Sequence, residues 1–168
     1  MSEEVATTQS YLSFKLGEEV FATNVSKVRE ILQLTKITNI PQAPSYMMGV
    51  INLRGIVLPV IDARDKFRLP LTETTVNTCI IVLNIEMDED TLMLGIMVDS
   101  VLEVFDLSEE EIKPVPSIGS KYKSEFILGM VKKEEEFIIL LDIDKVFSSD
   151  EISFVMEQTE DIATPPTN

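Results

Sequence analysis

Residues 49–62 constrain the fold more than any other stretch of the chain, because two apolar runs flank a short polar centre that contains glycine. Gly55 can adopt the positive φ angles of a tight turn, so the sequence predicts a hairpin with strands over 49–53 and 56–61. Apolar residues fill almost every strand position, which indicates burial on both faces. Arg54 is a long cation at the tip of this hairpin, where it must reach water or an acidic partner.

The two halves of the chain resemble each other in order and spacing. The segment 25–31 recurs at 98–104, an offset of 98 − 25 = 73, and Asp62 recurs as Asp142, an offset of 142 − 62 = 80. Each half runs hairpin, Val-x-x-Val-x-Glu segment, proline-containing connection, hairpin and helical turn. The remaining strands are predicted over 11–16, 20–22, 78–85, 92–98, 126–131 and 137–141, with a strand or short helix over 101–107.

Short, closely spaced strands in both halves predict a mainly β protein with two small barrels. We expect one domain over 10–157, made of two intertwined five-stranded subdomains near 10–70 and 77–145 that exchange chain. Halves of this size are marginal alone and share a core, which leaves a groove between them that suits a protein partner. Residues 1–9 and 158–168 are expected to be flexible tails.

Helical structure is expected in only a few places. Asn24 is predicted to cap a helical segment over 25–32, whose apolar positions fall on one side. A short strand is predicted over 35–40. A short helical turn follows each half, the second of them after Asp142, and a C-terminal helix capped at Ser148 or its neighbour completes the fold.

The residue types of common catalytic and metal sites are scarce. The chain has no histidine and one cysteine, Cys79, in an apolar run where a buried thiol is expected. It has no zinc-ligand spacing, no cysteine pair for a disulfide and no glycine-rich phosphate loop. Carboxylate chemistry at Asp62 or Asp142 stays open as an alternative, although their matching positions favour helix capping. We therefore expect no catalytic activity, no metal and no cofactor.

Charge narrows the possible partners. The net charge is −15 over 168 residues, and no stretch concentrates lysine and arginine. Such a chain is a poor ligand for nucleic acid phosphates and for an anionic membrane surface. No apolar run is long enough to span a bilayer, and the N-terminal residues lack the pattern of a signal peptide. The sequence therefore predicts a cytoplasmic protein without direct membrane insertion.

The central hairpin, with Asn-Leu-Arg-Gly at 52–55 and Leu-Pro-Val-Ile-Asp at 58–62, resembles the signature of the CheW family of bacterial chemotaxis coupling proteins. The resemblance continues in order from about 11 to 156. It implies two SH3-like barrels in a non-catalytic adaptor that joins methyl-accepting chemoreceptors to the regulatory domain of the histidine kinase CheA. It also implies recruitment to membrane receptor arrays. An adaptor of a chemosensory-like pathway with an output other than motility stays open.

In the family, a groove between the barrels receives the tip of the receptor's helical hairpin. The matching positions here are Leu12, Val25, Val28, Glu30, Gly49, Arg54 and Val101. Their apolar members suit the apolar stripe of a helix, and Arg54 can pair with a carboxylate or carbonyl on it. The kinase-facing surface, at a barrel end, matches Val57 and Phe154. Repeated contacts of this kind are expected to assemble receptors and kinase into an array.

Overall fold

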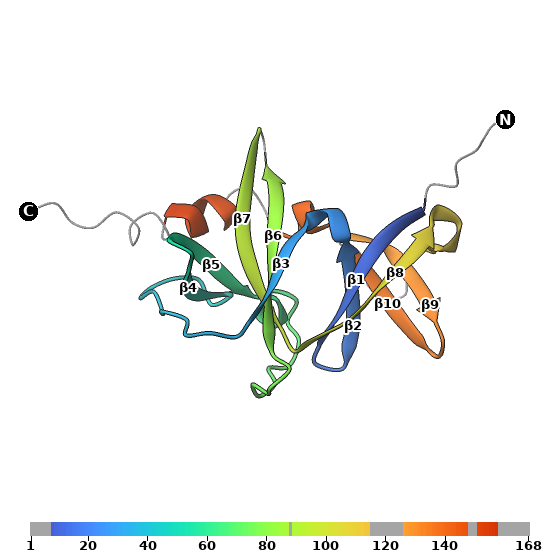
Figure 1. The fold of residues 1–168 in the computed structure, drawn as a ribbon, viewed down its shortest axis with the longest axis horizontal. Coiled ribbons are helices and arrows are strands. Elements are labelled where there is room, and N and C mark those ends of the chain that lie inside the picture. Colours follow the sequence, from blue (N-terminus) through green and yellow to red (C-terminus); the bar gives the residue numbers. More distant parts are fainter. Residues whose placement is uncertain (1–7, 88, 115–125, 148–150, 158–168) are drawn as a thin grey trace, which may run out of the picture.

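A computed structural model describes residues 8–87, 89–114, 126–147 and 151–157 of the chain. These residues form ten strands in two five-stranded sheets that lie side by side (Figure 1). Sheet A contains β1 (Thr8–Leu16), β2 (Glu19–Asn24), β8 (Ser100–Ser108), β9 (Ile127–Lys133) and β10 (Glu136–Leu141). Sheet B contains β3 (Val28–Gln33), β4 (Met47–Leu53), β5 (Ile56–Asp62), β6 (Cys79–Met87) and β7 (Asp90–Val98). The predicted mainly β fold is confirmed.

Helical structure is short throughout the described residues. Four single turns are present: η1 (Val25–Lys27), α1 (Ala63–Lys66), η2 (Glu109–Glu111) and η4 (Ile143–Lys145). Residues 151–157 are helical, and the predicted serine cap at 148 or 149 lies outside the described residues. No helix of the described ranges is long and apolar enough to cross a membrane.

The two sheets have the same strand order when the halves of the chain are compared. Sheet A runs β8-β1-β2-β10-β9 and sheet B runs β3-β6-β7-β5-β4. If β6 to β10 are counted as second copies of β1 to β5, both orders become 3-1-2-5-4. Sheet A therefore contains the first two strands of the first half, β1 and β2, and the last three of the second half, β8 to β10. Sheet B contains the last three strands of the first half, β3 to β5, and the first two of the second half, β6 and β7. The chain passes between sheets twice, from β2 to β3 and from β7 to β8.

Each sheet closes into a barrel through one isolated bridge. In sheet B the backbones of Thr38 and Val50 exchange two hydrogen bonds of 2.9 Å, which joins the segment after β3 to β4. In sheet A the backbones of Lys113 and Met130 do the same at 2.9 and 2.8 Å. These bridges connect the edges that the strand orders leave open. The strand predicted over 35–40 is reduced to the single bridge at Thr38.

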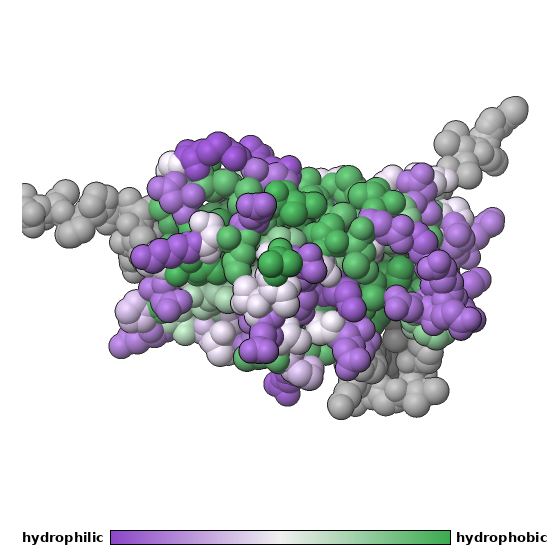
Figure 2. All heavy atoms as spheres, turned by 60° about the horizontal axis from the view of Figure 1, so that its bottom comes forward, coloured by the Kyte–Doolittle hydropathy of each residue, from purple (hydrophilic) through white to green (hydrophobic). Residues whose placement is uncertain are grey.

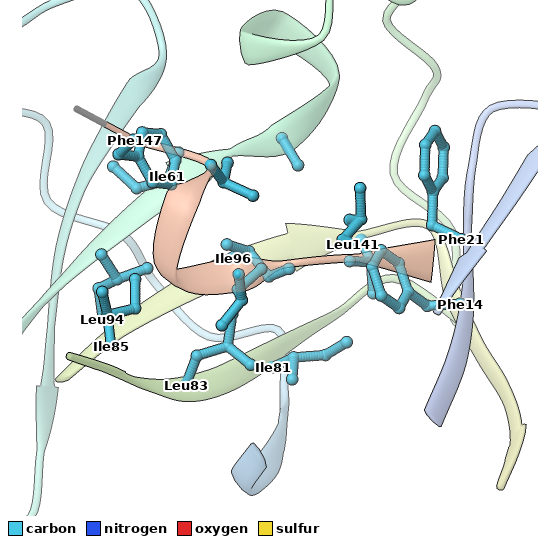
Figure 3. Packing of buried hydrophobic residues seen from close by; sticks show 14 of the residues in the cluster. Phe14, Phe21, Ile61, Ile81, Leu83, Ile85, Leu94, Ile96, Leu141 and Phe147 are labelled. Atoms are coloured by element: carbon cyan, nitrogen blue, oxygen red, sulfur yellow. The ribbon is translucent and has the colours of Figure 1, made fainter. Parts of the chain in front are cut away.

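The described residues form three apolar clusters. One lies inside each barrel, and the largest takes residues from both sheets, so it is shared between the barrels. Phe14 and Leu83 of the shared cluster are fully buried, and Leu141 joins them from β10 (Figure 3). Along β1 and β6, alternate residues face the barrel interior and the shared cluster, as the period of a strand requires. The two barrels thus share one core.

The helix predicted over 25–32 is wrong. Asn24 does act as a cap, and its side chain accepts a hydrogen bond of 2.8 Å from the amide of Ser26, but only the single turn η1 follows. Residues 28–33 form β3, with half-buried and exposed positions in strict alternation. Pairing with β6 favours the strand, and β-branched residues suit a half-buried strand.

Smaller differences concern the chain ends and the thiol. β1 begins at Thr8, inside the range predicted as an N-terminal tail, whereas residues 1–7 and 158–168 lie outside the described residues. Cys79 is half-buried rather than buried. The segment 101–107, for which strand and helix were both open, is part of β8.

Candidate functional site

The edge strand β3 presents an apolar face to the space between the barrels. Val28 pairs with Leu83 of β6, and Ile31 pairs with Ile81. Directly paired residues of antiparallel strands point to the same face, and both β6 residues belong to the shared cluster. Val28 is half-buried, whereas Ile31 is 46% exposed. This face of β3 therefore combines a half-buried valine that packs on the shared cluster with an exposed isoleucine that is accessible to a partner.

The edge strand β8 repeats this arrangement in the other barrel. Val101 pairs with Phe14 of β1, and Val104 pairs with Leu12. Phe14 and Leu12 also belong to the shared cluster, so Val101 and Val104 point to the same space. Val101 is half-buried and Val104 is 57% exposed.

The end of β3 and the start of β8 both contact Cys79 at the junction of the barrels. Cys79 pairs with Gln33 at the end of β3, and a backbone hydrogen bond joins its thiol to Val101 at the start of β8. Burial, the larger effect, raises the pKa of the Cys79 thiol, and the bond from Val101 opposes it. We name the apolar surface over the shared cluster the inter-barrel stripe. It consists of Val28 and Ile31 of β3, Val101 and Val104 of β8 and Val25 of η1, with Leu12 of β1 buried in the cluster below them. Figure 2 shows apolar side chains exposed across the middle of one face of the molecule.

Four of the predicted site residues thus lie on one surface. Val25 and Val28 come from η1 and the start of β3, Val101 comes from β8, and Leu12 is buried in the cluster on which all three pack. Sequence reasoning missed Ile31 and Val104, the two most exposed members. The signal was available, because 104 − 31 = 73 is the offset of the repeat.

Arg54 and Glu30 form an ion pair at the end of barrel B. Arg54 occupies the β4–β5 turn with φ +49°, and the following turn residue, Gly55, has φ +88°. Its guanidinium donates to the Glu30 carboxylate on β3, and this hydrogen bond, aided by the charge, raises the pKa of Arg54. The pair joins the edge strand β3 to the β4–β5 turn of sheet B. Arg54 remains 68% exposed, so its other donors are available to a partner.

Glu30 points away from the stripe. It pairs with Val82, which lies in the core of barrel B, whereas Val28 faces the shared cluster. The ion pair therefore lies beside the inter-barrel stripe, around the edge of β3. Barrel A has a related pair, because Glu103 bonds Lys133 at 3.1 Å and 103 − 30 = 73.

Gly49 holds the bridge that closes barrel B. Its φ is +147°, and a Cβ atom at this position would lie 2.1 Å from the carbonyl oxygen of Thr38. A side chain therefore cannot be added without breaking the close approach of two backbones. Gly129 occupies the equivalent position in barrel A, with φ +157° and the Lys113 carbonyl oxygen 2.7 Å from a built Cβ.

The two predicted kinase-facing residues lie on different elements. Val57 is half-buried on β5 and lines a shallow pocket of about 180 Å³ with Thr38, Val50, Ile51 and Asn52. Phe154 is 41% exposed on the helix over 151–157, and Ile152 of the same helix is buried in the shared cluster. Both side chains are accessible enough to contact a partner.

Asp62 and Asp142 are capping residues. The Asp62 side chain accepts from the amide of Arg64 at 3.0 Å, and the Asp142 side chain accepts from the amide of Asp144 at 3.3 Å. The predicted capping role is confirmed for both, and each carboxylate is held in the first turn of its own helix. Within the residues that the structure describes, no group of three or more histidine, cysteine, aspartate or glutamate side chains is placed to hold a metal ion.

Two interlocked barrels with an exposed apolar stripe define a scaffold protein, which works by contact with other proteins. Comparison with protein families identifies the scaffold, because a CheW-like domain matches residues 10–151. The chain belongs to the CheW family of chemotaxis coupling adaptors.

Individual relatives agree with this assignment. The chain is 36% identical over 140 residues to the chemotaxis protein CheW of Rhizobium meliloti (strain 1021), covering 83% of this chain and 88% of the relative. It is 37% identical over 147 residues to the chemotaxis protein CheW of Klebsiella aerogenes, covering 88% and 86%. Among solved structures, the scaffolding protein TtCheW of Thermoanaerobacter tengcongensis matches with a TM-score of 0.76 and 27% identity, covering 90% of this chain and 95% of that one.

Proposed function

We propose that this chain is a cytoplasmic, non-catalytic adaptor that couples methyl-accepting chemoreceptors to the histidine kinase CheA in membrane-associated arrays. The receptor's helical tip is the ligand of the inter-barrel stripe. The single observation that supports this is the exposure of Ile31 and Val104 beside half-buried valines. An amphipathic helix binds by laying its apolar side chains into a groove of this composition.

Arg54 gives the site its polar contact. Its side chain lies beside the stripe and is mostly exposed, with one carboxylate partner in Glu30. A guanidinium has five donors, so it can bond a carboxylate or carbonyl of the incoming helix while it keeps Glu30. The remaining surface is acidic, which favours partners whose contact regions are basic and disfavours unspecific association.

A second surface, which includes Val57 on β5 and Phe154 on the helix over 151–157, is proposed to bind the regulatory domain of the kinase. Each single contact need only be weak, because repeated contacts in an array add through effective concentration. Signal transfer requires that the adaptor bind the two activity states of the kinase with different free energies. We propose no direct contact with nucleic acid and no insertion into the membrane.

Co-sedimentation with receptor fragments tests this function. The purified chain should co-sediment with receptor cytoplasmic fragments and with CheA. Arg54→Glu should lower receptor affinity by at least about 1 kcal/mol, roughly fivefold, without lowering the unfolding temperature, because the side chain is exposed. Lys132→Glu, which reverses an exposed charge on β9, is the matched control and should bind normally. Normal binding by Arg54→Glu, or its unfolding, contradicts the proposed role of Arg54.

A further inference from the structure

The two passages of the chain between the barrels each carry a polar cluster. The first passage is η1, between β2 and β3, and the second is Asp99, between β7 and β8. At both passages a charged side chain meets a residue of the helical turn that ends one half. Both clusters join atoms of the two barrels.

The cluster at the second passage is centred on Arg64 of α1. Its Nη1 lies 3.2 Å from Oδ1 of Asp99, while its Nε and Nη2 lie 3.0 and 3.1 Å from the two oxygens of Asp62. Oδ2 of Asp99 accepts a hydrogen bond of 2.5 Å from the amide of Gly17, in the β1–β2 turn of sheet A. The Arg64 side chain is only 6% exposed. We name this set clamp 1; it connects α1, which follows sheet B strand β5, to sheet A.

The cluster at the first passage is centred on Asp144 of η4. Its Oδ2 lies 2.6 Å from Nζ of Lys27 in η1, and its Oδ1 accepts a hydrogen bond of 2.9 Å from the amide of Glu86. The Glu86 carboxylate lies 3.8 Å from the same Lys27 nitrogen. We name this set clamp 2; it connects η4, which follows sheet A strand β10, to β6 of sheet B.

The two clamps occupy equivalent places in the repeat, with opposite charges. Asp144 and Arg64 differ by 144 − 64 = 80, the offset that relates the second hairpins of the two halves. Clamp 1 has the cation on the helical turn and the carboxylate at the passage, whereas clamp 2 has the reverse. In both clamps a carboxylate oxygen also accepts a hydrogen bond from a backbone amide. The donor is Gly17 of the β1–β2 hairpin in clamp 1 and Glu86 of the β6–β7 hairpin in clamp 2.

We propose that these two charge-inverted clamps fix the angle between the barrels and so set the spacing of the inter-barrel stripe. Lys27 lies between Val25 and Val28, and Asp99 lies two residues before Val101, so each clamp anchors one wall of the stripe. The Arg64–Asp62 pair of clamp 1 is buried, whereas Lys27 and Asp144 of clamp 2 are half-buried, with side chains 22% and 27% exposed. Separating the charges of a buried pair is strongly penalised, and separating those of a half-buried pair is penalised less. The effect on receptor binding rests on the proposed function, whereas the effect on barrel orientation does not.

Charge reversal at clamp 2 tests the proposal. Lys27→Glu places a third carboxylate beside Asp144 and Glu86 and should open the clamp. The double variant Lys27→Glu with Asp144→Lys rebuilds an ion pair with the charge pattern of clamp 1 and should restore it. Lys133→Glu is the matched control, because it breaks an ion pair between half-buried Lys133 and exposed Glu103 that lies within sheet A and does not join the barrels.

Barrel orientation is measured with spin labels, in the absence of any receptor. Labels are attached to cysteines introduced at Glu19 of sheet A and Ile56 of sheet B, both exposed, with Cys79 replaced by serine. The distance distribution should broaden or shift in Lys27→Glu and return in the double variant, and it should stay unchanged in Lys133→Glu. Receptor affinity should fall severalfold in Lys27→Glu and return to that of the parent chain in the double variant.

An unchanged distance distribution in folded Lys27→Glu would overturn the proposal. If that variant does not fold, Asp144→Asn replaces it, because the amide keeps an acceptor for Glu86 and removes only the charge; an unchanged distribution there is equally decisive. A distribution that responds while receptor affinity does not supports the clamps and contradicts the stripe as the receptor site.

Discussion

Val28 and Val101 occupy equivalent positions 73 residues apart, each near the start of an edge strand and each paired with a residue of the shared cluster. The same offset relates Ile31 to Val104, so the inter-barrel stripe has two walls of the same design. A surface built in this way presents matching apolar side chains from both barrels. The inter-barrel stripe thus takes its two walls from the two halves of the chain.

Closure of the barrels depends on glycine at two positions. Gly49→Ala and Gly129→Ala each place a Cβ atom 2.1 or 2.7 Å from a carbonyl oxygen across the closing bridge. We expect each to lower the free energy of unfolding by roughly 1–3 kcal/mol more than Gly55→Ala does. Gly55 is the matched control, because its φ is +88° but no atom lies within 4 Å of a built Cβ. Equal losses at all three positions, measured by urea unfolding, contradict the role of the close approach.

Removal of the Arg64 guanidinium should lower the free energy of unfolding strongly. Arg64→Met leaves the buried Asp62 and the partly buried Asp99 without their shared cation, and breaking a buried pair from one side costs about 3–5 kcal/mol. Arg29→Met, at an exposed position on β3, should change stability by less than about 0.5 kcal/mol. Urea unfolding compares the two variants. A loss below about 1 kcal/mol for Arg64→Met, typical of a surface pair, would show that the carboxylates do not depend on it.

Thr23 offers a substitution that should stabilise the fold. Its side chain is fully buried, and its hydroxyl has no hydrogen-bond partner among the described residues. Thr23→Val removes this unsatisfied group at nearly constant volume and should raise the free energy of unfolding by about 1 kcal/mol. Thr78 is the control, because its buried hydroxyl accepts a 2.9 Å bond from the Thr75 amide. Thr78→Val should be destabilising, and a loss of stability in both variants contradicts the assignment for Thr23.

Two tyrosines should make the fold sensitive to alkaline pH. Burial is the main cause that raises the pKa of Tyr11 and of Tyr46, with further contributions from Glu109 and Glu151 respectively. The folded state therefore holds these protons after the unfolded chain has begun to lose them near pH 10. Stability from this source is complete below that pH and is lost as the pH rises through the folded values.

Thermal unfolding as a function of pH checks this expectation. The unfolding temperature should fall above about pH 10, and Tyr11→Phe with Tyr46→Phe should flatten the decline. An equally steep decline in the double variant would mean that other groups cause it.

The sequence predicts most of the strands because their signals are local. The hairpin at 49–61 is recognised from its apolar runs and Gly55, and β4 and β5 match it within two residues. The segment 25–32 is ambiguous, since Val25, Val28 and Ile31 are spaced as on a helix while their β-branched side chains suit a strand. Pairing with β6, about 50 residues away, decides in favour of the strand, and such pairing is not visible locally.

The clamps are harder to predict than the strands. Arg64 follows Asp62 by two residues and looks like a polar turn at the surface, yet both side chains are buried. Their burial follows from the way the second half of the chain crosses over the first, which brings Asp99 onto α1. The repeat offsets identify equivalent positions, but they do not show which barrel receives each strand. That information comes only from the assembled sheets.

Binding of a receptor helical-tip fragment, measured by calorimetry, tests the central claim most directly. Val28→Asp and Val101→Asp place a charge on each wall of the inter-barrel stripe, and Val76→Asp makes the same change at a fully exposed valine. We predict at least a tenfold loss of affinity for each wall variant, about 1.4 kcal/mol or more, and no change for Val76→Asp. If all three folded variants bind the fragment as tightly as the parent chain, the stripe is not the receptor site.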